Sequence, residues 1–377
     1  QRPDLPIVVI TDPVNEAYGG SPSPHFARLR AAGIPVVSTR LEPLRDSNPA
    51  WSVPWRMFLQ WFGTAPGGIL PHPFARGAPG VGLRSWFSLL NFKANHRKLV
   101  IADTPAPAGG RRLTALVMSA NPHDGSSAHG NAGLLVHGET ARDLLRSEQA
   151  VLDLSGHPDR LEDHLRTAQP APPPPPADGP GRVEVQALTE RPIRDSLVAH
   201  LDGTGPGDGI DVAQFYLSDR LVVEALVRAA RRRVAIRLLL DPNRDAFGHE
   251  KTGVPNRPVA AELLARGGPS LAVRWYATHG EQFHTKLVLL RQPGRDTLLA
   301  GSANLTRRNL GDLNLETNLR VSGPPATPAL AAARAYFERL WSNEGHPFTL
   351  DYAAYADPAW TRRWRYRFQE ATGLGGF

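Results

Sequence analysis

The tripeptides His96-Arg97-Lys98 and His284-Thr285-Lys286 decide how this chain folds, because each one leads into an apolar run and then into a Ser-x-Asn turn. The runs cover residues 99–102 and 287–290, and the turns are Ser119-Ala120-Asn121 and Ser302-Ala303-Asn304. A pattern that occurs twice along one chain predicts two related halves that contribute to one shared active site.

The spacing inside each copy indicates how its side chains are arranged. An apolar run of about five residues is typical of a strand, and side chains at positions i and i+2 of a strand share one face. The His and Lys of each copy therefore point the same way. A Ser-x-Asn turn after the next strand, at 113–118 or 297–300, would return a hydroxyl and an amide beside them. Two facing copies would surround one anion, which predicts a phosphate site with its own nucleophile.

Lysine usage supports this interpretation. The chain has four lysines among its 43 basic residues, at positions 93, 98, 251 and 286. Two of the four occupy the same position of the two tripeptides, which random placement does not explain. The pattern favours a phosphodiesterase-type site over the alternative of two basic strands packed in a core.

The pattern H-x-K-x(4)-D with a following G-S-x-N resembles the phospholipase D superfamily. The flanking text, such as residues 91–95 and 240–243, is similar to the cardiolipin-synthase-like bacterial branch, so the likeness covers nearly the whole chain. Two positions depart from the pattern, since Arg291 stands where Asp is expected and Met118 precedes Ser119 in place of Gly. The resemblance implies an α/β fold of two similar α/β/α lobes with mixed sheets, related by a pseudo-twofold, with the active site at their interface.

A Pro-rich stretch divides the chain into two parts. Residues 170–182 are predicted to form a stiff exposed linker between an N-terminal lobe, 1–169, and a C-terminal lobe, 183–377. Overlaying the lobes sets the strand at 7–10 on 210–215, the helix at 26–32 on 221–230 and the strand at 36–38 on 234–238. The second lobe then carries an extra strand and helix, so we expect about 25 residues of the first lobe upstream of Gln1.

Composition limits the class of protein. A chain of 377 residues with 41% apolar residues can bury a sizeable core. The absence of Cys excludes disulfides and thiolate chemistry and leaves the redox compartment open. A net charge of +7 favours contact with polyanions, whether nucleic acid, an anionic bilayer or a phosphorylated substrate. No apolar stretch is long enough for a transmembrane helix.

The resemblance implies a phosphohistidine intermediate, in which one His attacks phosphorus and the other protonates the leaving alcohol. We assign His96 as the nucleophile and His284 as the acid. Lys98 and Lys286 supply fixed positive charge. The turns supply hydrogen bonds, because Asn121 and Asn304 can donate from their amides and Ser119 and Ser302 can hold oxygens or orient an imidazole. Two imidazoles in different protonation states predict a bell-shaped pH–rate profile.

Three further residues complete the predicted machinery. Asp103 has the spacing of the motif and is counted with the catalytic residues, with a part in supporting ion pairs. Glu316, on the strand after the second turn, is predicted to orient an imidazole, and its counterpart in the first half is Asn131. A carboxylate beside one imidazole and an amide beside the other would separate their pKa values.

The surroundings of the site are predicted less directly. No metal and no other cofactor is expected, since the histidines lack ligand spacing. His279 is predicted to line the substrate pocket, together with Trp61 and Phe92 from a block rich in Trp and Phe. Such rings mixed with Arg suit a bilayer interface, although they could also form core. The stretch 362–368 presents the same two alternatives.

The sequence therefore predicts a bacterial, peripheral-membrane phospholipase D or phosphatidyltransferase, with cardiolipin synthase among the candidates. Its partners would be an anionic or zwitterionic phospholipid at a membrane surface and water or an alcohol as acceptor, without an obligate protein partner. A cytoplasmic and a periplasmic or secreted location both stay open. The main alternative is a phosphodiesterase for single-stranded nucleic acid. A non-catalytic anion-binding scaffold, suggested by Arg291, is disfavoured because both His and both Lys are present.

Overall fold

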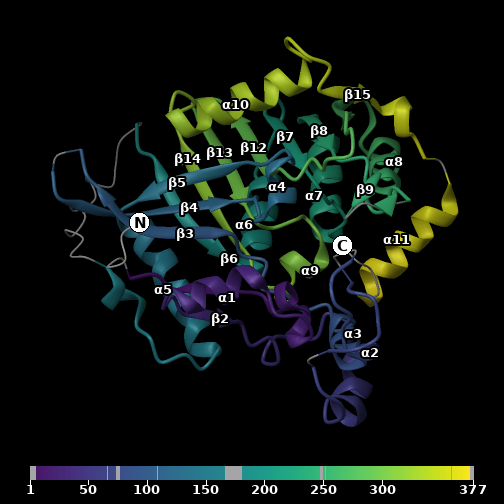
Figure 1. Cartoon of the computed structure of the whole chain (residues 1–377). Helices are drawn as coiled ribbons and strands as arrows, with labels where there is room; N and C mark the ends of the chain where they lie inside the picture. The colour runs from purple at the N-terminus through teal and green to yellow at the C-terminus, as the bar shows by residue number, and fades with distance from the viewer. Residues whose placement is uncertain are drawn as a thin grey trace.

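The computed structural model of the chain describes residues 6–65, 67–73, 77–107, 109–165, 181–246, 249–250, 252–357 and 359–373. Strands and helices alternate along it, and Figure 1 shows a large mixed sheet with helices packed around it. The predicted α/β class is confirmed. Within the described ranges, no helix has both the length and the apolar character needed to cross a bilayer.

The C-terminal half is built on one eight-stranded sheet. Its order is β15-β11-β8-β7-β12-β13-β14-β6, and only the β7-β8-β11 part is parallel. The bounds are β6 Glu184–Thr189, β7 Gly209–Gln214, β8 Ala235–Leu240, β11 Leu271–Tyr276, β12 Lys286–Gln292, β13 Arg295–Gly301, β14 Thr317–Gly323 and β15 Thr349–Asp351.

Both faces of this sheet are covered, which explains its continuous apolar runs. Val288 and Leu290 of β12 face a core formed with α6 (Arg191–Asp202), α7 (Arg220–Arg231) and α8 (Asn256–Gly267). Leu287 and Leu289, on the opposite face of the same strand, pack in a second core with α10 (Pro328–Trp341). The second H-x-K tripeptide therefore leads into the centre of the molecule.

The N-terminal half contains two smaller sheets. β1 (Val9–Thr11) and β2 (Val36–Ser38) are parallel and joined through α1 (Pro24–Ala31). β3 (Leu99–Pro105), β4 (Arg111–Met118) and β5 (Gly133–His137) form an antiparallel sheet. This sheet packs on α5 (Glu139–Leu154) and on Leu319 of β14, so the two halves share a core.

The remaining elements are short connectors and one terminal helix. They are η1 Pro13–Gly19, α2 Pro49–Pro54, η2 Trp55–Leu59, α3 Leu83–Leu89, α4 Asp124–Ser127, η3 Leu161–His164, β9 Asp245–Ala246, β10 His249–Glu250, η4 Gly268–Ser270, α9 Arg307–Leu310, η5 Tyr352–Tyr355 and α11 Trp360–Thr372.

The internal repeat is real, but the predicted overlay of β1 on β7 is wrong. The unit β1-α1-β2 is a parallel pair joined by a helix, as are both β7-α7-β8 and β8-α8-β11. It repeats β8-α8-β11, because Asp12 after β1 and Asp241 after β8 each accept the amide of the residue before a motif histidine, and β3-β4-β5 repeats β12-β13-β14. Each first strand is also followed directly by Asp-Pro, at Asp12 and Asp241. In the second half β7 lies between β8 and β12 and joins them into one sheet. The described part of the first half has no strand equivalent to β7, so β1-β2 and β3-β4-β5 form two separate sheets.

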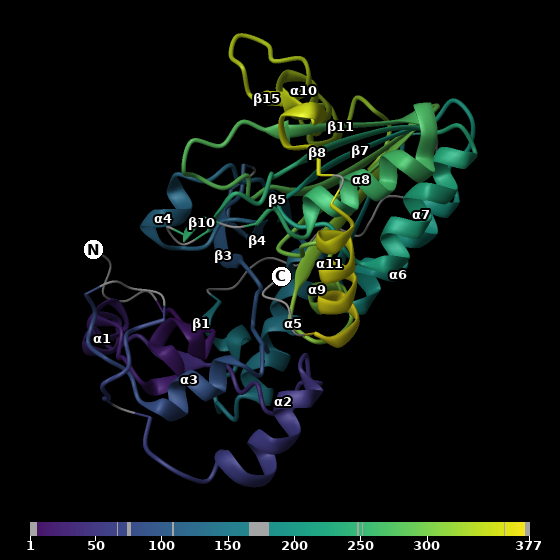
Figure 2. The same cartoon turned by 90° about the vertical axis from the view of Figure 1, so that its right-hand side faces the viewer.

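Two organisational features frame the site. The linker predicted at 170–182 lies mostly outside the described residues, and the predicted lobe boundaries stay predictions. Between β2 and His96 the first half makes a long excursion through α2, η2 and α3, whereas few residues separate β11 from His284. Figures 1 and 2 both show this excursion projecting away from the large sheet.

Candidate active site

Backbone hydrogen bonds between the halves bring the two tripeptides together. The His96 amide donates to the Leu315 carbonyl at 2.9 Å, at the entry to β14. The Leu315 amide in turn donates to the Ala94 carbonyl at 2.9 Å, and the Gly130 amide makes the equivalent bond to the Gln282 carbonyl at 3.0 Å, two residues before His284. Each tripeptide therefore lies against the segment that follows the Ser-x-Asn turn of the other half.

This crossing gives each imidazole a partner from the opposite half. His96 Nδ1 lies 2.8 Å from Glu316 Oε1, and His284 Nδ1 lies 3.3 Å from Asn131 Oδ1. The structure thus places Glu316 and Asn131 at equivalent positions, as carboxylate and amide. In both pairs Nδ1 is occupied, which leaves Nε2 as the nitrogen that can meet a substrate.

The two turn serines fix these partners. Ser302 Oγ donates to Glu316 Oε2 at 2.5 Å, and Ser119 Oγ donates to Asn131 Oδ1 at 3.0 Å. Each serine oxygen also accepts the amide of the residue after its partner, Thr317 or Ala132. Both serines are fully buried. Their hydroxyls orient the residues that orient the imidazoles.

Hydrogen bonds and nearby positive groups hold the Glu316 carboxylate ionised despite its burial. It accepts bonds from His96, Ser302 and Asn309, and none of its surface is exposed. Burial alone would raise its pKa, but His96, Lys98 and Ser302 outweigh burial and the pKa lies below the usual value. Glu316 is therefore a fixed negative charge behind His96.

The two lysines are buried beside their own histidines. Lys98 Nζ donates to the His96 carbonyl at 2.7 Å, and Lys286 Nζ donates to the His284 carbonyl at 2.9 Å. Burial lowers the pKa of Lys98 to about 8 against the opposing effect of Glu316 and Asp12. The pKa of Lys286 falls well below its usual value, first through burial and then through the charge of Lys98. An anion between them would stabilise both charges.

The two imidazoles differ in electrostatics. Burial lowers the pKa of His96, while the charge and hydrogen bond of Glu316 act against this. The pKa of His284 lies well below the usual value because of burial and then of Lys286, Lys98 and His96. Since groups from one half act on groups of the other, the two tripeptides share one electrostatic site.

Two further carboxylates, Asp12 and Asp241, bind the backbone directly before the two tripeptides. Asp12 Oδ2 accepts the amide of Asn95, and Asp241 Oδ2 accepts the amide of Phe283, each directly before a motif histidine. Asp12 acts electrostatically on Lys98, and Asp241 acts on Lys286. Sequence reasoning missed this role, although the repeated Asp-Pro after a strand was a usable signal.

Aromatic side chains close the His284 side of the site. The rings of Phe215 and His284 have centroids 5.0 Å apart, and Lys286 Nζ lies 5.3 Å from the Phe215 centroid. The His129 ring is 6.0 Å from that of His284, and its Nδ1 accepts the Gln282 amide. His129 was not singled out from the sequence, because nothing local shows that the segment before β5 lies beside the second tripeptide.

The turn asparagines are placed differently from each other. Asn304 is 6% exposed, and its side-chain oxygen has no hydrogen-bond partner among the described residues. Asn121 is half-buried, and its backbone amide donates to Ser126 Oγ at 2.9 Å. Both asparagines lie in the turns that begin with Ser119 and Ser302, but of the two only Asn304 is buried.

The structure does not bring Asp103 or Arg291 to the imidazoles, which corrects the grouping of Asp103 with the catalytic residues. Asp103 lies seven residues beyond His96, about 23 Å along a strand, and pairs with Arg111 at 2.5 Å. Its expected part in an ion pair is confirmed. Arg291 Nε lies 2.8 Å from the buried carboxylate of Asp211, which also binds Arg237.

The three predicted pocket residues lie in different surroundings, and their contact with substrate stays a prediction. His279 is 73% exposed at its side chain and lies 3.9 Å from Glu281, so it faces solvent. Trp61 is exposed on the excursion that follows β2, and its indole nitrogen donates to the Arg56 carbonyl. Phe92 lies under the guanidinium of Arg308, whose carbon is 4.7 Å from the ring centroid.

The described residues form no cluster of metal-ligating side chains. Within those ranges no group of three or more His, Cys, Asp or Glu side chains could hold a metal ion. The positive groups needed beside a phosphate come from Lys98 and Lys286 themselves.

Comparisons with known proteins bear on this site. Residues 198–341 match the family model described as cardiolipin synthase, PLD-like domain. No curated protein matches the chain significantly.

Solved structures that align with the chain include the phospholipase D family member Nuc from Salmonella typhimurium (17% identity, 45% of this chain and 98% of Nuc, TM-score 0.35). Phosphatidylserine synthase from Haemophilus influenzae aligns at 12% identity over 70% of this chain and 69% of its own, with TM-score 0.45. Polyphosphate kinase from Porphyromonas gingivalis aligns at 14% identity over 97% of this chain and 45% of its own, with TM-score 0.47.

The family match spans β12, the second tripeptide and its Ser-x-Asn turn, and the repeat in the first half supplies the matching set of side chains. Residues 198–341 therefore form a phospholipase D-like domain.

Proposed function

We propose that this protein is a phospholipase D-type enzyme that cleaves or transfers the phosphatidyl group of glycerophospholipids through a phosphohistidine intermediate on His96. The observation that carries the proposal is the crossed pairing of the imidazoles, His96 with the Glu316 carboxylate and His284 with the Asn131 amide. A carboxylate stabilises positive charge on an imidazole, whereas a neutral amide does not.

That difference assigns the first chemical step. His96, neutral and donating its Nδ1 proton to Glu316, attacks phosphorus through Nε2, and the charge that develops on its ring is stabilised by the carboxylate. The bond from phosphorus to the leaving alcohol breaks as His284 gives that oxygen a proton. His284, whose pKa is the more strongly lowered, is the stronger acid once an anionic substrate has allowed it to protonate.

The second step reverses the proton transfer. Neutral His284 takes a proton from water or from an acceptor alcohol, whose oxygen then attacks phosphorus. The bond from His96 to phosphorus breaks, and the imidazole is restored. Lys98 and Lys286 lie against the carbonyls of the two histidines, where their charges can neutralise the phosphoryl oxygens in both steps.

Two features support a lipid as the substrate. The matching family model is described as cardiolipin synthase-like. The aromatic excursion between β2 and His96 ends at α3, seven residues before the proposed nucleophile, and exposes large apolar side chains. Peripheral attachment to a membrane surface, with phospholipid as partner and water or an alcohol as acceptor, is part of the same proposal.

A second candidate function is cleavage of single-stranded nucleic acid. The net charge of +7 favours it, because a basic surface attracts any polyanion. The same two-step chemistry would serve a nucleic acid phosphodiester, so the substrate decides between the two candidates.

The test is product analysis by mass spectrometry. Wild type, His96→Ala and the control His279→Ala, which alters a solvent-facing histidine, are incubated with vesicles of phosphatidylcholine and phosphatidylglycerol, with and without a primary alcohol. Phosphatidic acid, a phosphatidyl alcohol or cardiolipin from wild type and His279→Ala alone is the expected result. Absence of lipid products together with cleavage of single-stranded DNA would overturn the lipid assignment in favour of a nuclease.

A further inference from the structure

The excursion between β2 and His96 exposes a stripe of large apolar side chains. We call the described residues between 49 and 90 the arm. Along its helical first part and the turn that follows, Val53, Met57 and Trp61 recur every four residues, together with Phe58 and Phe62; Trp61 and Phe62 are 71% and 72% exposed. A helix of a soluble protein normally turns such a stripe to the core. Here the stripe faces solvent.

The arm nevertheless has a fixed base. Lys93 Nζ donates to the carbonyls of Glu42 and Leu44, at 3.2 and 2.5 Å, and lies 3.0 Å from Asp46. Asn48 Nδ2 donates to the Leu90 carbonyl at 2.9 Å, so the residue before the arm is tied to the end of the arm. The exposed stripe is therefore carried on an anchored element that ends six residues before His96.

A second stripe of the same kind lies on α11. Trp360, Trp364 and Phe368 recur every four residues, are 76%, 64% and 43% exposed, and the rings of the last two stack at 5.4 Å. Tyr366 and Glu370, on the opposite face, are buried. The exposed residues Arg363 and Arg365 lie among these rings. The alternative that this face docks on its own domain is therefore wrong for the described residues.

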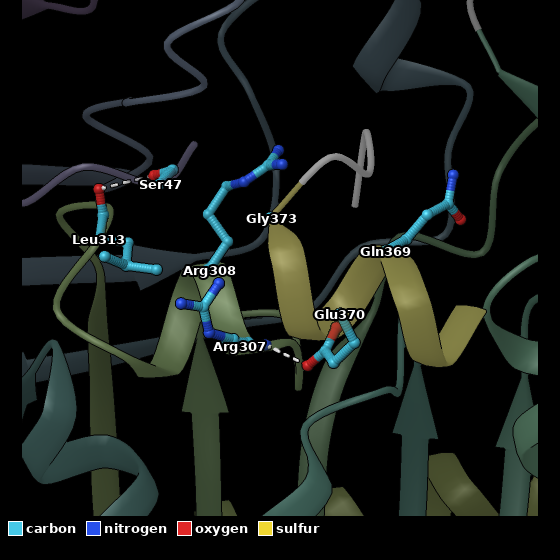
Figure 3. A pocket seen from close by; sticks show the side chains of 7 residues that line it. All are labelled: Ser47, Arg307, Arg308, Leu313, Gln369, Glu370 and Gly373. Atoms are coloured by element: carbon cyan, nitrogen blue, oxygen red, sulfur yellow. Dashed lines mark hydrogen bonds between the residues drawn. The ribbon is translucent and has the colours of Figure 1, made fainter. Parts of the chain in front are cut away.

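The two stripes are connected through the base of the arm. A small cavity of about 10 Å³ is lined by Ser47, two residues before α2, and by Gln369, Glu370 and Gly373 at the end of α11 (Figure 3). Ser47 Oγ donates to the Leu313 carbonyl, and the Arg307 amide donates to Glu370 at 2.8 Å (Figure 3). Figure 2 shows α11 directly above the arm. The segment 307–313 therefore contacts both the base of the arm and the end of α11.

We propose that the arm and the outer face of α11 together form a docking surface for an anionic phospholipid bilayer. The inference rests on the proposed function, whose substrate lies in such a bilayer. Trp and Phe rings with interspersed Arg match the interface, where rings enter the headgroup region and guanidinium groups meet lipid phosphate. Single-stranded nucleic acid, the other polyanion, is favoured less because the exposed side chains Val53, Met57 and Phe62 offer apolar surface without charge.

The test is flotation of the full chain with vesicles of phosphatidylcholine alone or mixed with phosphatidylglycerol. The variants are Trp61→Ser with Phe62→Ser, Trp364→Ser, and all three together. Leu221→Ser is the matched control, since it removes a 52% exposed apolar side chain from α7 of the other half. Hydrolysis of a water-soluble phosphodiester and thermal unfolding check that the site and fold are intact.

We expect wild type and Leu221→Ser to float with the mixed vesicles, and each arm or α11 variant to partition roughly tenfold less, with a greater loss in the combined variant. Turnover of the water-soluble substrate should stay unchanged. Equal flotation of all variants would overturn the inference, as would loss of single-stranded DNA binding in these variants without any loss of vesicle binding.

The outcome is separable from that of the proposed function. Vesicle binding through the two stripes without any lipid product would contradict the lipid substrate and leave the docking surface standing. Lipid turnover in vesicles that is insensitive to the three substitutions would overturn the docking surface alone.

Discussion

Asp12 and Asp241 hold the two motif histidines from behind in the same way, although 229 residues separate them. Each follows a strand, and each accepts the backbone amide of the residue before a histidine, Asn95 at 2.5 Å and Phe283 at 2.7 Å. The repeat therefore extends beyond the side chains that meet the substrate to the carboxylates that position them.

The substitution Asp12→Asn tests this positioning role. It removes a charge that raises the pKa of Lys98 toward its present value of about 8, so that pKa should fall further and Lys98 should lose its proton at lower pH. We expect a kcat about tenfold lower and an alkaline limb of the pH–rate profile shifted to lower pH. Profiles on a water-soluble phosphodiester measure both. Asp103→Asn, outside the site, is the control, and an unshifted limb in Asp12→Asn would contradict the role.

Glu316→Gln keeps the shape of the side chain and removes its charge. The imidazole of His96 would then develop positive charge beside a neutral amide, so we expect kcat to fall by about a hundredfold or more with little change in KM. Steady-state kinetics check this. Glu148→Gln, which alters a buried carboxylate paired with Arg97, is the control and should affect stability but leave kcat and KM unchanged. An increase in KM with kcat unchanged would contradict a role of Glu316 in stabilising charge on His96.

Asn131→Asp tests the other half of the asymmetry. A carboxylate 3.3 Å from His284 Nδ1 would raise the pKa of that imidazole, which now lies well below its usual value. Because His284 must be protonated to act as the acid, the alkaline limb of the profile should move to higher pH. If the acidic limb moves instead, His284 is not the acid.

Anion binding should be linked to proton uptake. The pKa values of Lys98, Lys286 and both histidines are all lowered by burial in the free site, and a bound phosphodiester would raise them. Affinity for a dialkyl phosphate should therefore fall as the pH rises through about 8, the pKa of Lys98. Calorimetry in buffers of different ionisation enthalpy measures the protons taken up. Affinity that is constant between pH 6 and 9 would refute the linkage.

Arg291 has a structural role where the family pattern has Asp. It shares the buried Asp211 with Arg237, so Arg291→Ala should lower the free energy of unfolding by about 1–2 kcal/mol and leave kcat within about twofold. Arg291→Asp should destabilise the protein more, because it places two carboxylates together. Chemical denaturation with parallel kinetics checks both. A large loss of kcat at unchanged stability would place Arg291 in the site.

The sequence was sufficient for the side chains at the centre of the candidate site. His96, Lys98, Glu316 and Asn131 could be predicted because strand spacing and the doubled motif fix their places relative to each other, and the structure brings them together. The strands that follow each tripeptide could also be predicted, because each begins with a continuous apolar run.

The rest depended on contacts between distant segments. The overlay was set one unit out because β7 and β8 are both apolar strands, and only the bonds made by Asp12 and Asp241 distinguish them. His279 is close to His284 in sequence but faces solvent, whereas His129, distant in sequence, lies beside it. Local patterns carry no information on such packing.

The central claim, that His96 forms the covalent intermediate, is tested most directly by trapping it. A phosphatidyl ester of p-nitrophenol needs no acid to leave, so His284→Ala should still be attacked but should lack the base for the second step. Peptide mass spectrometry after a rapid quench should then find the phosphatidyl group on His96, and find none in His96→Ala. An adduct on His284 in a His96→Ala background, or no adduct in any variant while turnover continues, would contradict the account.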